Sequence, residues 1–302
     1  MADSLVDRLG QIAAGHRGTP RPGEDCVVVG LLGRGIQSSR TPGMHEREAR
    51  RLGIDYAYLL LDFDMLALPD AAVGDVLDAA QAAGFQGVNV THPFKQAIMP
   101  SLDDLSPEAF AIGAVNTVVF REGRKVGHNT DAWGFRESFR ETMAGSAMRT
   151  IALFGAGGAG AAVAYALDGL GADELVVIDT EAARAEDLAR RMASRAAGRI
   201  IASRDAAAAV AAAGGIVNTT PIGMAKYPGT PFPADLLSPR QWVAEIVYFP
   251  EETELLRRAR ALGCRTLAGT GMAVYQAVRA FELFTGVAPD RQAMAGHFEA
   301  AA

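Results

Sequence analysis

A glycine-rich turn between a strand and a helix narrows the fold to a few classes. Residues 151–154 form a short apolar run, and residues 155–160 then read Gly-Ala-Gly-Gly-Ala-Gly, which matches the pattern G-x-G-x-x-G. Glycines let the backbone turn sharply and approach a pyrophosphate, whose charge then meets the amides and the positive dipole end of the following helix. The pattern predicts a Rossmann-type dinucleotide site. Its phosphate-binding residues are predicted to be Gly155, Ala156, Gly157, Gly158, Ala159 and Gly160.

An acidic residue follows the turn at a suitable spacing. The next strand-like run, ELVVID, ends at Asp179, and 179 minus 155 is 24, close to the roughly 20 residues typical of a ribose-binding acid. A carboxylate there accepts hydrogen bonds from the ribose hydroxyls and repels a 2′-phosphate, so NAD is predicted over NADP. Arg184 could offer charge to a 2′-phosphate, but we interpret it as an ordinary helix-surface arginine. NADP therefore stays as the alternative cofactor.

Length and charge set the outer limits. At roughly 150 residues per domain, 302 residues predict two domains or one large α/β unit. The chain is 49% hydrophobic and 21% charged, which is typical of a globular protein rather than a disordered one. Its 35 acidic and 29 basic residues give a net charge of -6, so nucleic acid is not an expected partner.

Strand-like and helix-like runs alternate through the first half of the chain. The runs CVVVGLLG, YAYLLLDFD and GVNVT are typical of strands, while DAAVGDVLDAAQAAG and PEAFAIGAV are typical of helices. This order predicts right-handed βαβ units and a mostly parallel sheet. After a polar helix that starts near Thr130, a second series of strands and helices begins. There the charge spacing of EAARAEDLARRMASRAAGR predicts a solvent-facing helix.

Membrane and metal chemistry are not expected. Residues 206–217 are too short and too weakly apolar to cross roughly 30 Å of hydrocarbon, and the N-terminus mixes Asp with Arg, unlike a secretory signal. A cytoplasmic location is therefore predicted. Cys26 and Cys264 lack CxxC neighbours and are interpreted as buried thiols. His45 and His128 have no neighbours at metal-ligand spacing, so no metal site is predicted.

Seven motifs, in order, resemble one known family. They are SSRTPGMH, GVNVTHPFK, IGAVNTVV, GHNTDAWGF, NTTPIGM, EIVYFPEETELLRRA and GTGMAVYQA. Together they resemble the shikimate dehydrogenase family, most closely its quinate/shikimate dehydrogenase branch, from Val27 to about Gly286. The resemblance implies a two-domain α/β fold with an N-terminal substrate-binding domain and a Rossmann-type domain. The implied segments are an extension at 1–24, a substrate domain at 25–130 completed by helices in 271–302, and an NAD-binding domain at 131–270.

The resemblance also implies the proton chemistry. Oxidation of an alcohol by a nicotinamide moves a hydride and a proton, so a proton-transfer group must lie beside the reacting oxygen. Lys95 in NVTHPFK matches the catalytic lysine of the family, and Asp131 in HNTD matches its acidic partner. We interpret the pair as one coupled proton relay that also orients the hydroxyl. Pro93 is expected to start a helix that carries Lys95, and His92 is not interpreted as catalytic.

Shikimate and quinate are ring carboxylates with several hydroxyls, and a selective pocket needs short polar side chains on rigid loops. The resemblance assigns the carboxylate to Ser39 and Thr41, where Thr41 replaces a serine that is commoner in the biosynthetic enzymes. It assigns further substrate contacts to Asn89, Thr91, Asn116, Thr130, Tyr248 and Gln276. In NTTPIGM, it adds Thr219 and Met224 to the cofactor-binding residues.

The sequence thus predicts an NAD-dependent oxidoreductase that interconverts shikimate and 3-dehydroshikimate, and also quinate and 3-dehydroquinate. Two alternatives stay open, an NADP-dependent biosynthetic shikimate dehydrogenase and a catalytically inactive dinucleotide-binding sensor. The intact Lys95 and Asp131 argue against the sensor. The expected partner is the small-molecule substrate, and the chain is expected to be a monomer or a homodimer.

Overall fold

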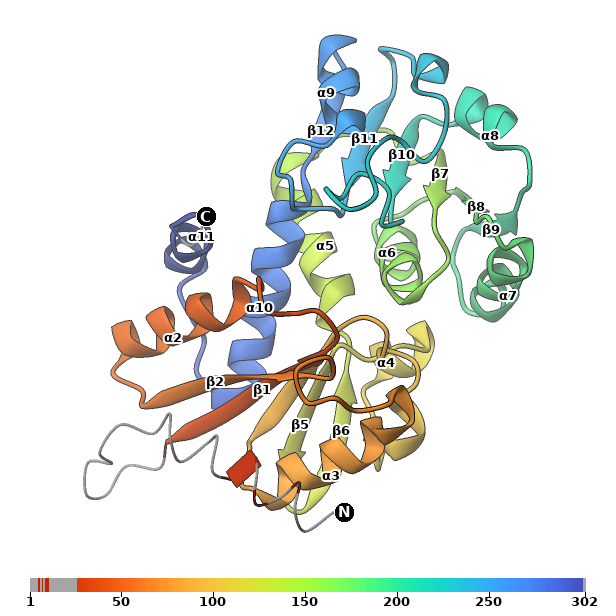
Figure 1. Cartoon of the computed structure of the whole chain (residues 1–302). Coiled ribbons are helices and arrows are strands. Elements are labelled where there is room, and N and C mark those ends of the chain that lie inside the picture. Colours follow the sequence, from red (N-terminus) through yellow and green to blue (C-terminus); the bar gives the residue numbers. More distant parts are fainter. Residues whose placement is uncertain (1–4, 6, 8, 11–25, 301–302) are drawn as a thin grey trace. The chain divides into compact units, whose positions relative to one another are not determined.

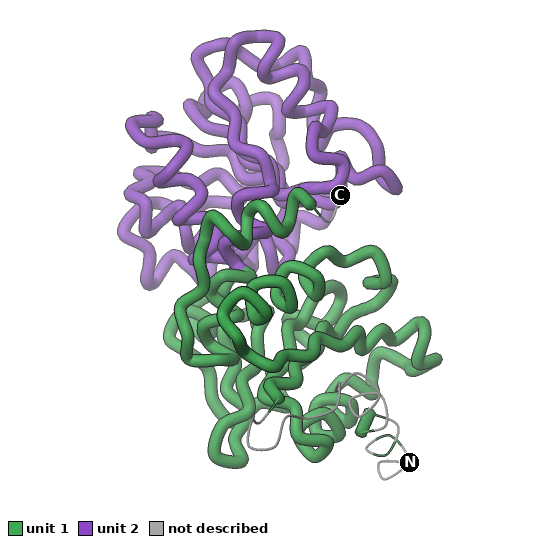
Figure 2. Tube along the Cα trace, turned by 90° about the vertical axis from the view of Figure 1, so that its left-hand side faces the viewer, with its two compact units in different colours: residues 1–130, 277–302 green, residues 131–276 purple. Residues whose placement is uncertain are grey.

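The structure, a computed structural model, describes residues 5, 7, 9–10 and 26–300. Its contacts divide the chain into two compact units (Figure 2). Unit 1 comprises Met1–Thr130 with Ala277–Ala302, and unit 2 comprises Asp131–Gln276. The N-terminal extension predicted at residues 1–24 lies mostly outside the described residues. Of those that are described, Leu9 is buried in the core of unit 1.

Unit 1 is built on a six-stranded sheet in the order β2-β1-β3-β5-β6-β4. The first three strands are parallel, as the alternating runs predicted. The strands are β1 (Val27–Gly33), β2 (Tyr56–Asp62), β3 (Gly87–Val90), β4 (Asp104–Leu105), β5 (Thr117–Arg121) and β6 (Arg124–His128). The antiparallel pair β5–β6 was not predicted. Its two-residue turn places Glu122 at φ 53° and Gly123 at φ 75°, the left-handed geometry of a tight hairpin.

Helices cover both faces of this sheet. Successive β1 side chains alternate between two cores: Val28 and Leu32 face one core cluster, while Val29 and Leu31 face the other. Residues of α3 and α4 line the first core, and residues of α10 line the second (Figure 1). The helices are α2 (Thr41–Leu52), α3 (Val73–Ala82), α4 (Pro107–Ile112), α10 (Gly269–Thr285) and α11 (Arg291–Glu299), with 3-10 turns η1 (Asp70–Ala72) and η2 (Met99–Ser101).

Unit 2 has a fully parallel six-stranded sheet in the order β12-β11-β10-β7-β8-β9. Counted from β7 as the first strand, this is the Rossmann order 3-2-1-4-5-6 read from the other edge. The strands are β7 (Thr150–Phe154), β8 (Glu174–Ile178), β9 (Arg199–Ala202), β10 (Gly215–Asn218), β11 (Trp242–Glu245) and β12 (Arg265–Leu267). The chain changes direction across the sheet at β7 and β10, and ligands bind at such switch points.

The helices of unit 2 follow the predicted alternation (Figure 1). They are α5 (Thr130–Thr142), α6 (Gly158–Gly169), α7 (Ala182–Ala193), α8 (Ala206–Ala212), η3 (Ala234–Leu236), α9 (Glu254–Ala261) and the start of α10. Helix α7 has a charged outer face, where Asp187 pairs with Arg191 at 2.9 Å. Its other face is buried through Leu188 and Met192, so the helix is amphipathic.

Cys264 is buried, as predicted, and Cys26 is half-buried; the two cysteines form no disulfide. Among the helices that the structure describes, none is both long enough and apolar enough to cross a membrane.

Candidate functional site

The glycine turn joins β7 to α6 with two kinds of glycine. Gly155 has φ 100°, a conformation that side chains disfavour. A Cβ atom on Gly160 would lie 2.1 Å from the Gly155 carbonyl oxygen, so Gly160 permits the helix to pack onto the turn. A Cβ atom on Gly157 would meet nothing within 4 Å. Gly155 and Gly160 are therefore needed by the turn itself, whereas Gly157 keeps the space in front of the turn open.

The start of α6 suits an anion. Gly157 is the N-cap residue and, as a glycine, has no side chain that could cap the first turn. Amides in the first turn of a helix lack partners within the helix, and the helix dipole is positive there. With the open space at Gly157, this arrangement fits the pyrophosphate of a dinucleotide.

Asp179 and Thr219 are brought to the same turn from β8 and β10. The Asp179 carboxylate accepts a hydrogen bond from the Ala156 amide at 2.8 Å. The Thr219 hydroxyl donates to the Phe154 carbonyl oxygen at 2.7 Å and lies 3.0 Å from the Gly155 carbonyl oxygen. Both side chains therefore brace the glycine turn. Met224, with 41% of its surface exposed, lies further along the segment after β10.

Arg184 forms an ion pair with Glu181, with 2.7 Å between guanidinium and carboxylate and both side chains exposed. This agrees with its interpretation as a helix-surface residue. The Glu181 amide also donates to Asp179 at 2.9 Å, so the acid that pairs with Arg184 follows the predicted ribose-binding acid closely.

In unit 1, Ser39 and Thr41 lie where β1 leads into α2. Thr41 is the first residue of α2, and its amide lies 3.4 Å from the Ser39 hydroxyl oxygen. The N-cap residue, Arg40, makes no side-chain capping hydrogen bond. Two half-buried hydroxyls thus stand beside a helix N-terminus, which favours a carboxylate electrostatically.

Three of the predicted substrate residues belong to one buried hydrogen-bond network in unit 1. Asn89 donates to the Thr117 hydroxyl at 2.9 Å, and that hydroxyl donates to the Asn116 side-chain oxygen at 3.1 Å. Asn116 then donates to the Thr130 hydroxyl at 2.9 Å. At the other end, the Tyr58 hydroxyl donates to Asn89 at 2.7 Å. Thr130 in turn donates to the Asn116 side-chain oxygen, through its amide at 2.7 Å and through its hydroxyl at 3.2 Å.

Sequence reasoning missed Tyr58 and Thr117. Burial raises the pKa of the Tyr58 hydroxyl above its ordinary value, so it stays a donor. Tyr58 lies in an apolar strand, where the sequence gives it the pattern of a core residue. Thr117 is the last residue of the IGAVNT motif and could have been predicted together with Asn116. Thr91, at the end of β3, is half-buried.

The segment that carries Lys95 is a series of turns, so the predicted helix at Pro93 is wrong. The Lys95 carbonyl oxygen accepts a hydrogen bond from the Val115 amide at 2.8 Å, and the Met99 amide bonds to the Gln96 carbonyl oxygen instead. Because a partner from another segment takes this carbonyl, the helical hydrogen-bond ladder does not continue. Lys95 is half-buried, and His92 is exposed.

The remaining predicted residues lie in unit 2. Asp131 is the second residue of α5 and is buried. Gln276 lies on α10, where its side chain donates to the Ala273 carbonyl oxygen of the same helix at 3.0 Å. A Cβ atom on Gly134 would lie 2.7 Å from the backbone nitrogen of Gln276, so α5 and α10 cross closely. Tyr248 follows β11 and is 39% exposed.

His45 is a buried core residue whose Nδ1 lies 2.9 Å from the Tyr56 hydroxyl. Burial lowers its pKa to about 3. Within the described part of the chain, no three or more His, Cys, Asp or Glu side chains are grouped so that they could hold a metal ion.

Two family models match the chain. Residues 31–118 match the shikimate dehydrogenase substrate binding domain, and residues 269–296 match the shikimate 5'-dehydrogenase C-terminal domain. The first match lies in unit 1, where Ser39, Thr41 and the buried network are found.

Several whole-length relatives are similar to the chain. A shikimate dehydrogenase (NADP(+)) of Streptomyces avermitilis is 52% identical, over 90% of this chain and 94% of the relative. A quinate/shikimate dehydrogenase (NAD(+)) of Corynebacterium efficiens is 48% identical, over 91% of this chain and 98% of the relative. Among solved structures, quinate dehydrogenase from Corynebacterium glutamicum in complex with NAD superposes with a TM-score of 0.84 at 44% identity, covering 92% of this chain and 100% of that one.

Proposed function

The chain belongs to the shikimate dehydrogenase family, and we propose that it interconverts shikimate and 3-dehydroshikimate, and also quinate and 3-dehydroquinate, with hydride transfer to NAD. One observation carries the proposal. Unit 2 places the glycine turn, Asp179 and Thr219 together where β7, β8 and β10 end. Unit 1 contains the hydroxyl and amide side chains of the substrate motifs. A polyhydroxylated ring carboxylate is the kind of substrate such side chains recognise.

In this proposal the substrate carboxylate is bound by Ser39 and Thr41, since two hydroxyls beside the N-terminus of α2 can each donate to a carboxylate oxygen. The ring hydroxyls are bound by the remaining polar side chains. These are Asn89, Thr91, Asn116, Thr130, Tyr248 and Gln276.

Lys95 and Asp131 carry out the proton transfer. When bound, the nicotinamide supplies the hydride acceptor for oxidation of the ring alcohol. Loss of hydride from carbon leaves a hydroxyl proton that must go to a base, and we assign it to the coupled Lys95/Asp131 relay. Thr130 directly precedes Asp131, so the buried network of unit 1 fixes the backbone from which the acidic member of the relay begins.

The cofactor is proposed to be NAD, bound by residues 155–160, Asp179, Thr219 and Met224. Two electrostatic features favour NAD over NADP. The Asp179 carboxylate repels a 2′-phosphate, and Arg184, the cation that could attract one, is paired with Glu181. Relatives of both preferences exist, so the NADP-dependent biosynthetic enzyme is the second candidate.

Domain roles follow from the same assignment. We propose residues 25–130, completed by 271–302, as the substrate-binding domain and residues 131–270 as the NAD-binding domain. A cytoplasmic location is part of the proposal. It is supported by Cys26 and Cys264, which form no disulfide, because oxidising compartments favour disulfides.

One assay tests the proposal. Absorbance at 340 nm is followed while shikimate and quinate are each supplied with NAD and with NADP. Turnover with NAD is expected for both substrates, and Asp179→Asn should shift the ratio of kcat/KM values towards NADP. A wild-type preference for NADP would favour the biosynthetic alternative, and no turnover with any pair would favour a sensor.

A further inference from the structure

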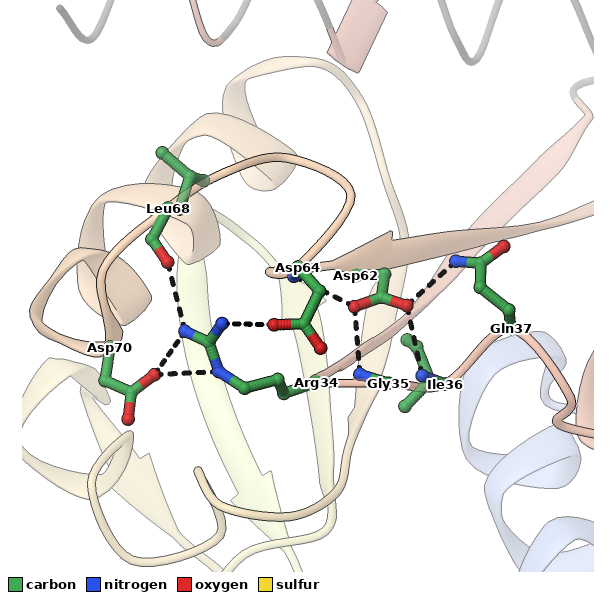
Figure 3. A network of polar contacts seen from close by, with 8 residues as sticks. All are labelled: Arg34, Gly35, Ile36, Gln37, Asp62, Asp64, Leu68 and Asp70. Carbon is green, nitrogen blue, oxygen red and sulfur yellow. Dashed lines mark hydrogen bonds and ion pairs between the residues drawn. The ribbon is translucent and has the colours of Figure 1, made fainter.

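A buried carboxylate organises the segment between β1 and α2. Asp62, the last residue of β2, accepts four hydrogen bonds (Figure 3). Its Oδ1 atom accepts from the amides of Gly35 and Asp64, each at 3.0 Å. Its Oδ2 atom accepts from the Ile36 amide at 3.0 Å and from the Gln37 side chain at 2.9 Å. Each oxygen therefore receives two donors, and three of the four donors are backbone amides.

The charge on Asp62 is stabilised in place. Burial raises the pKa of this carboxyl, but the hydrogen bonds from Gln37 and from the amides of Asp64, Ile36 and Gly35 together outweigh it, and the pKa lies below its ordinary value. The group is therefore an acceptor for every donor around it at neutral pH. A side chain that offered a donor in the same place would face two N–H groups.

The segment held by Asp62 leads directly to the proposed carboxylate-binding hydroxyls. The Ile36 carbonyl oxygen accepts a hydrogen bond from the Ser39 amide at 3.0 Å, and the Ser39 hydroxyl oxygen lies 3.4 Å from the Thr41 amide. Position 33 adds a second link. A Cβ atom on Gly33 would lie 2.4 Å from Thr91 and 2.8 Å from Ile36, so both side chains close on the same point of β1.

The same segment touches the turn that carries Lys95. The Arg34 amide donates to the His92 carbonyl oxygen at 3.3 Å. The guanidinium group of Arg34, by contrast, points outward to Asp64, Asp70 and the Leu68 carbonyl oxygen (Figure 3). Asp70 is 61% exposed, and ion pairs this exposed contribute little to stability. The network thus has a buried inner part at Asp62 and an exposed outer part at Arg34.

We propose that Asp62 is a positioning residue for the substrate carboxylate, which acts by fixing the backbone of residues 35–37 and through it Ser39 and Thr41. The inference rests on the proposed function. Its consequence is selective, because a loosened segment should weaken substrate binding while the glycine turn of unit 2 keeps its own contacts.

Asp62→Asn tests this with minimal change in size. Whichever way the amide turns, its NH2 group faces one of the two donor pairs, so at least one backbone N–H loses its acceptor. We expect the KM for shikimate and for quinate to rise at least tenfold, with kcat within about threefold of wild type and the KM for NAD unchanged. Tenfold corresponds to about 1.4 kcal/mol.

Two further variants supply controls. Asp70→Asn breaks only the exposed arm of the network and should leave all kinetic constants near wild type. Gln37→Met removes the one side-chain donor and keeps the three amides, so a rise in substrate KM of about twofold to threefold is expected. The order Asp62→Asn above Gln37→Met above Asp70→Asn would support the backbone as the element being held.

Thermal melting of each variant separates positioning from folding. If the Asp62→Asn variant does not fold, Gln37→Met becomes the test, and an unchanged substrate KM in that variant would overturn the inference. A folded Asp62→Asn variant with wild-type substrate KM would overturn it directly, as would equal losses in the affinity for NAD. Absence of wild-type turnover would instead overturn the proposed function and this inference with it.

Discussion

Two strand-to-helix segments of the molecule are each proposed to bind an anionic group, and they present different chemical groups to it. Residues 34–40, between β1 and α2, and residues 155–157, between β7 and α6, both follow a strand within the parallel part of its sheet. In unit 2, the Asp179 carboxylate accepts a hydrogen bond from the Ala156 amide, but the space in front of the turn is left open at Gly157, which has no side chain. In unit 1, the Asp62 carboxylate accepts hydrogen bonds from the backbone amides of Gly35 and Ile36, and the segment presents the hydroxyl side chains of Ser39 and Thr41.

The difference reflects the two proposed ligands. A pyrophosphate has many equivalent oxygens, so a set of backbone amides binds it without any particular side chain. A ring carboxylate with hydroxyls needs donors and acceptors at fixed positions, and these require side chains whose own support is rigid. The comparison predicts that substitutions in each segment affect one ligand only.

The largest effect is expected outside both segments. Lys95 lies on the turns after β3, and Lys95→Ala should lower kcat by roughly 10²-fold or more, the usual range for a lost acid or base. NAD affinity, measured by fluorescence titration, should stay near wild type because the glycine turn is untouched. A variant with unchanged turnover would remove Lys95 from the mechanism.

The next effect separates the two kinds of glycine in unit 2. Gly157→Val should abolish tight NAD binding and leave the fold intact, because its Cβ atom meets open space and the residue has φ -74°. Gly160→Val serves as the matched control and should unfold the turn, because its Cβ atom would overlap the Gly155 carbonyl oxygen. Binding titrations and thermal melting on both variants decide the matter. Wild-type NAD affinity in folded Gly157→Val would show that the motif is only a turn.

A more moderate effect is expected for the hydroxyls of unit 1. The Ser39→Ala/Thr41→Val double variant should raise the KM for shikimate and quinate at least tenfold, since each charge-assisted hydrogen bond is worth roughly 1.5–3 kcal/mol. The KM for NAD should not change. If the two side chains merely shape the turn before Pro42, the melting temperature would fall instead, and substrate affinity in the folded fraction would not.

The same contrast explains what could be predicted from the sequence. The glycine turn depends on conformations that few residue types adopt, so its letters identify it, and the Asp179 spacing adds a second signal. Strands buried on both faces, such as β1, are continuous apolar runs, and these were predicted correctly. Fold class and family follow from such local features.

Features that depend on distant partners could not be predicted. Asp62 ends an apolar strand and has no motif around it; its role appears only once the β1–α2 segment crosses the end of β2. Pro93 suggested a helix, but the Val115 amide takes the Lys95 carbonyl oxygen and ends the ladder. The Glu122–Gly123 hairpin turn was overlooked because its glutamate gives no turn signal. For Asp62 and Pro93 the decisive hydrogen-bond partner lies outside the local sequence pattern, and for the hairpin the local pattern gives only a weak signal.

The smallest effect concerns a second buried carboxylate, which sharpens the comparison with Asp62. Glu245 ends β11 in unit 2 and accepts hydrogen bonds from the Asn218 side chain at 3.0 Å, the Val247 amide at 3.0 Å and the Thr253 hydroxyl at 3.2 Å. Here burial outweighs the hydrogen bonds and raises the pKa from 4.5 to about 7. The buried strand ends of the two units thus carry carboxyls whose pKa values move in opposite directions.

The sign of the pH dependence follows. Because the folded pKa of Glu245 lies above its unfolded value, its contribution to stability is complete below pH 4.5 and is lost as the pH rises through about 7. Glu245→Gln, which mimics the protonated acid, should therefore gain melting temperature relative to wild type across that window, by a few degrees at most. For Asp62→Asn the difference should run the other way: because the pKa of Asp62 is lowered, the stability advantage of the wild type is complete above pH 3.8 and is lost as the pH falls below that value. Melting curves of both variants and wild type between about pH 2 and pH 8 measure the two slopes. A difference between Glu245→Gln and wild type that does not change with pH would show that Glu245 titrates alike in the folded and unfolded chain, and the contrast between the two carboxyls would then be lost.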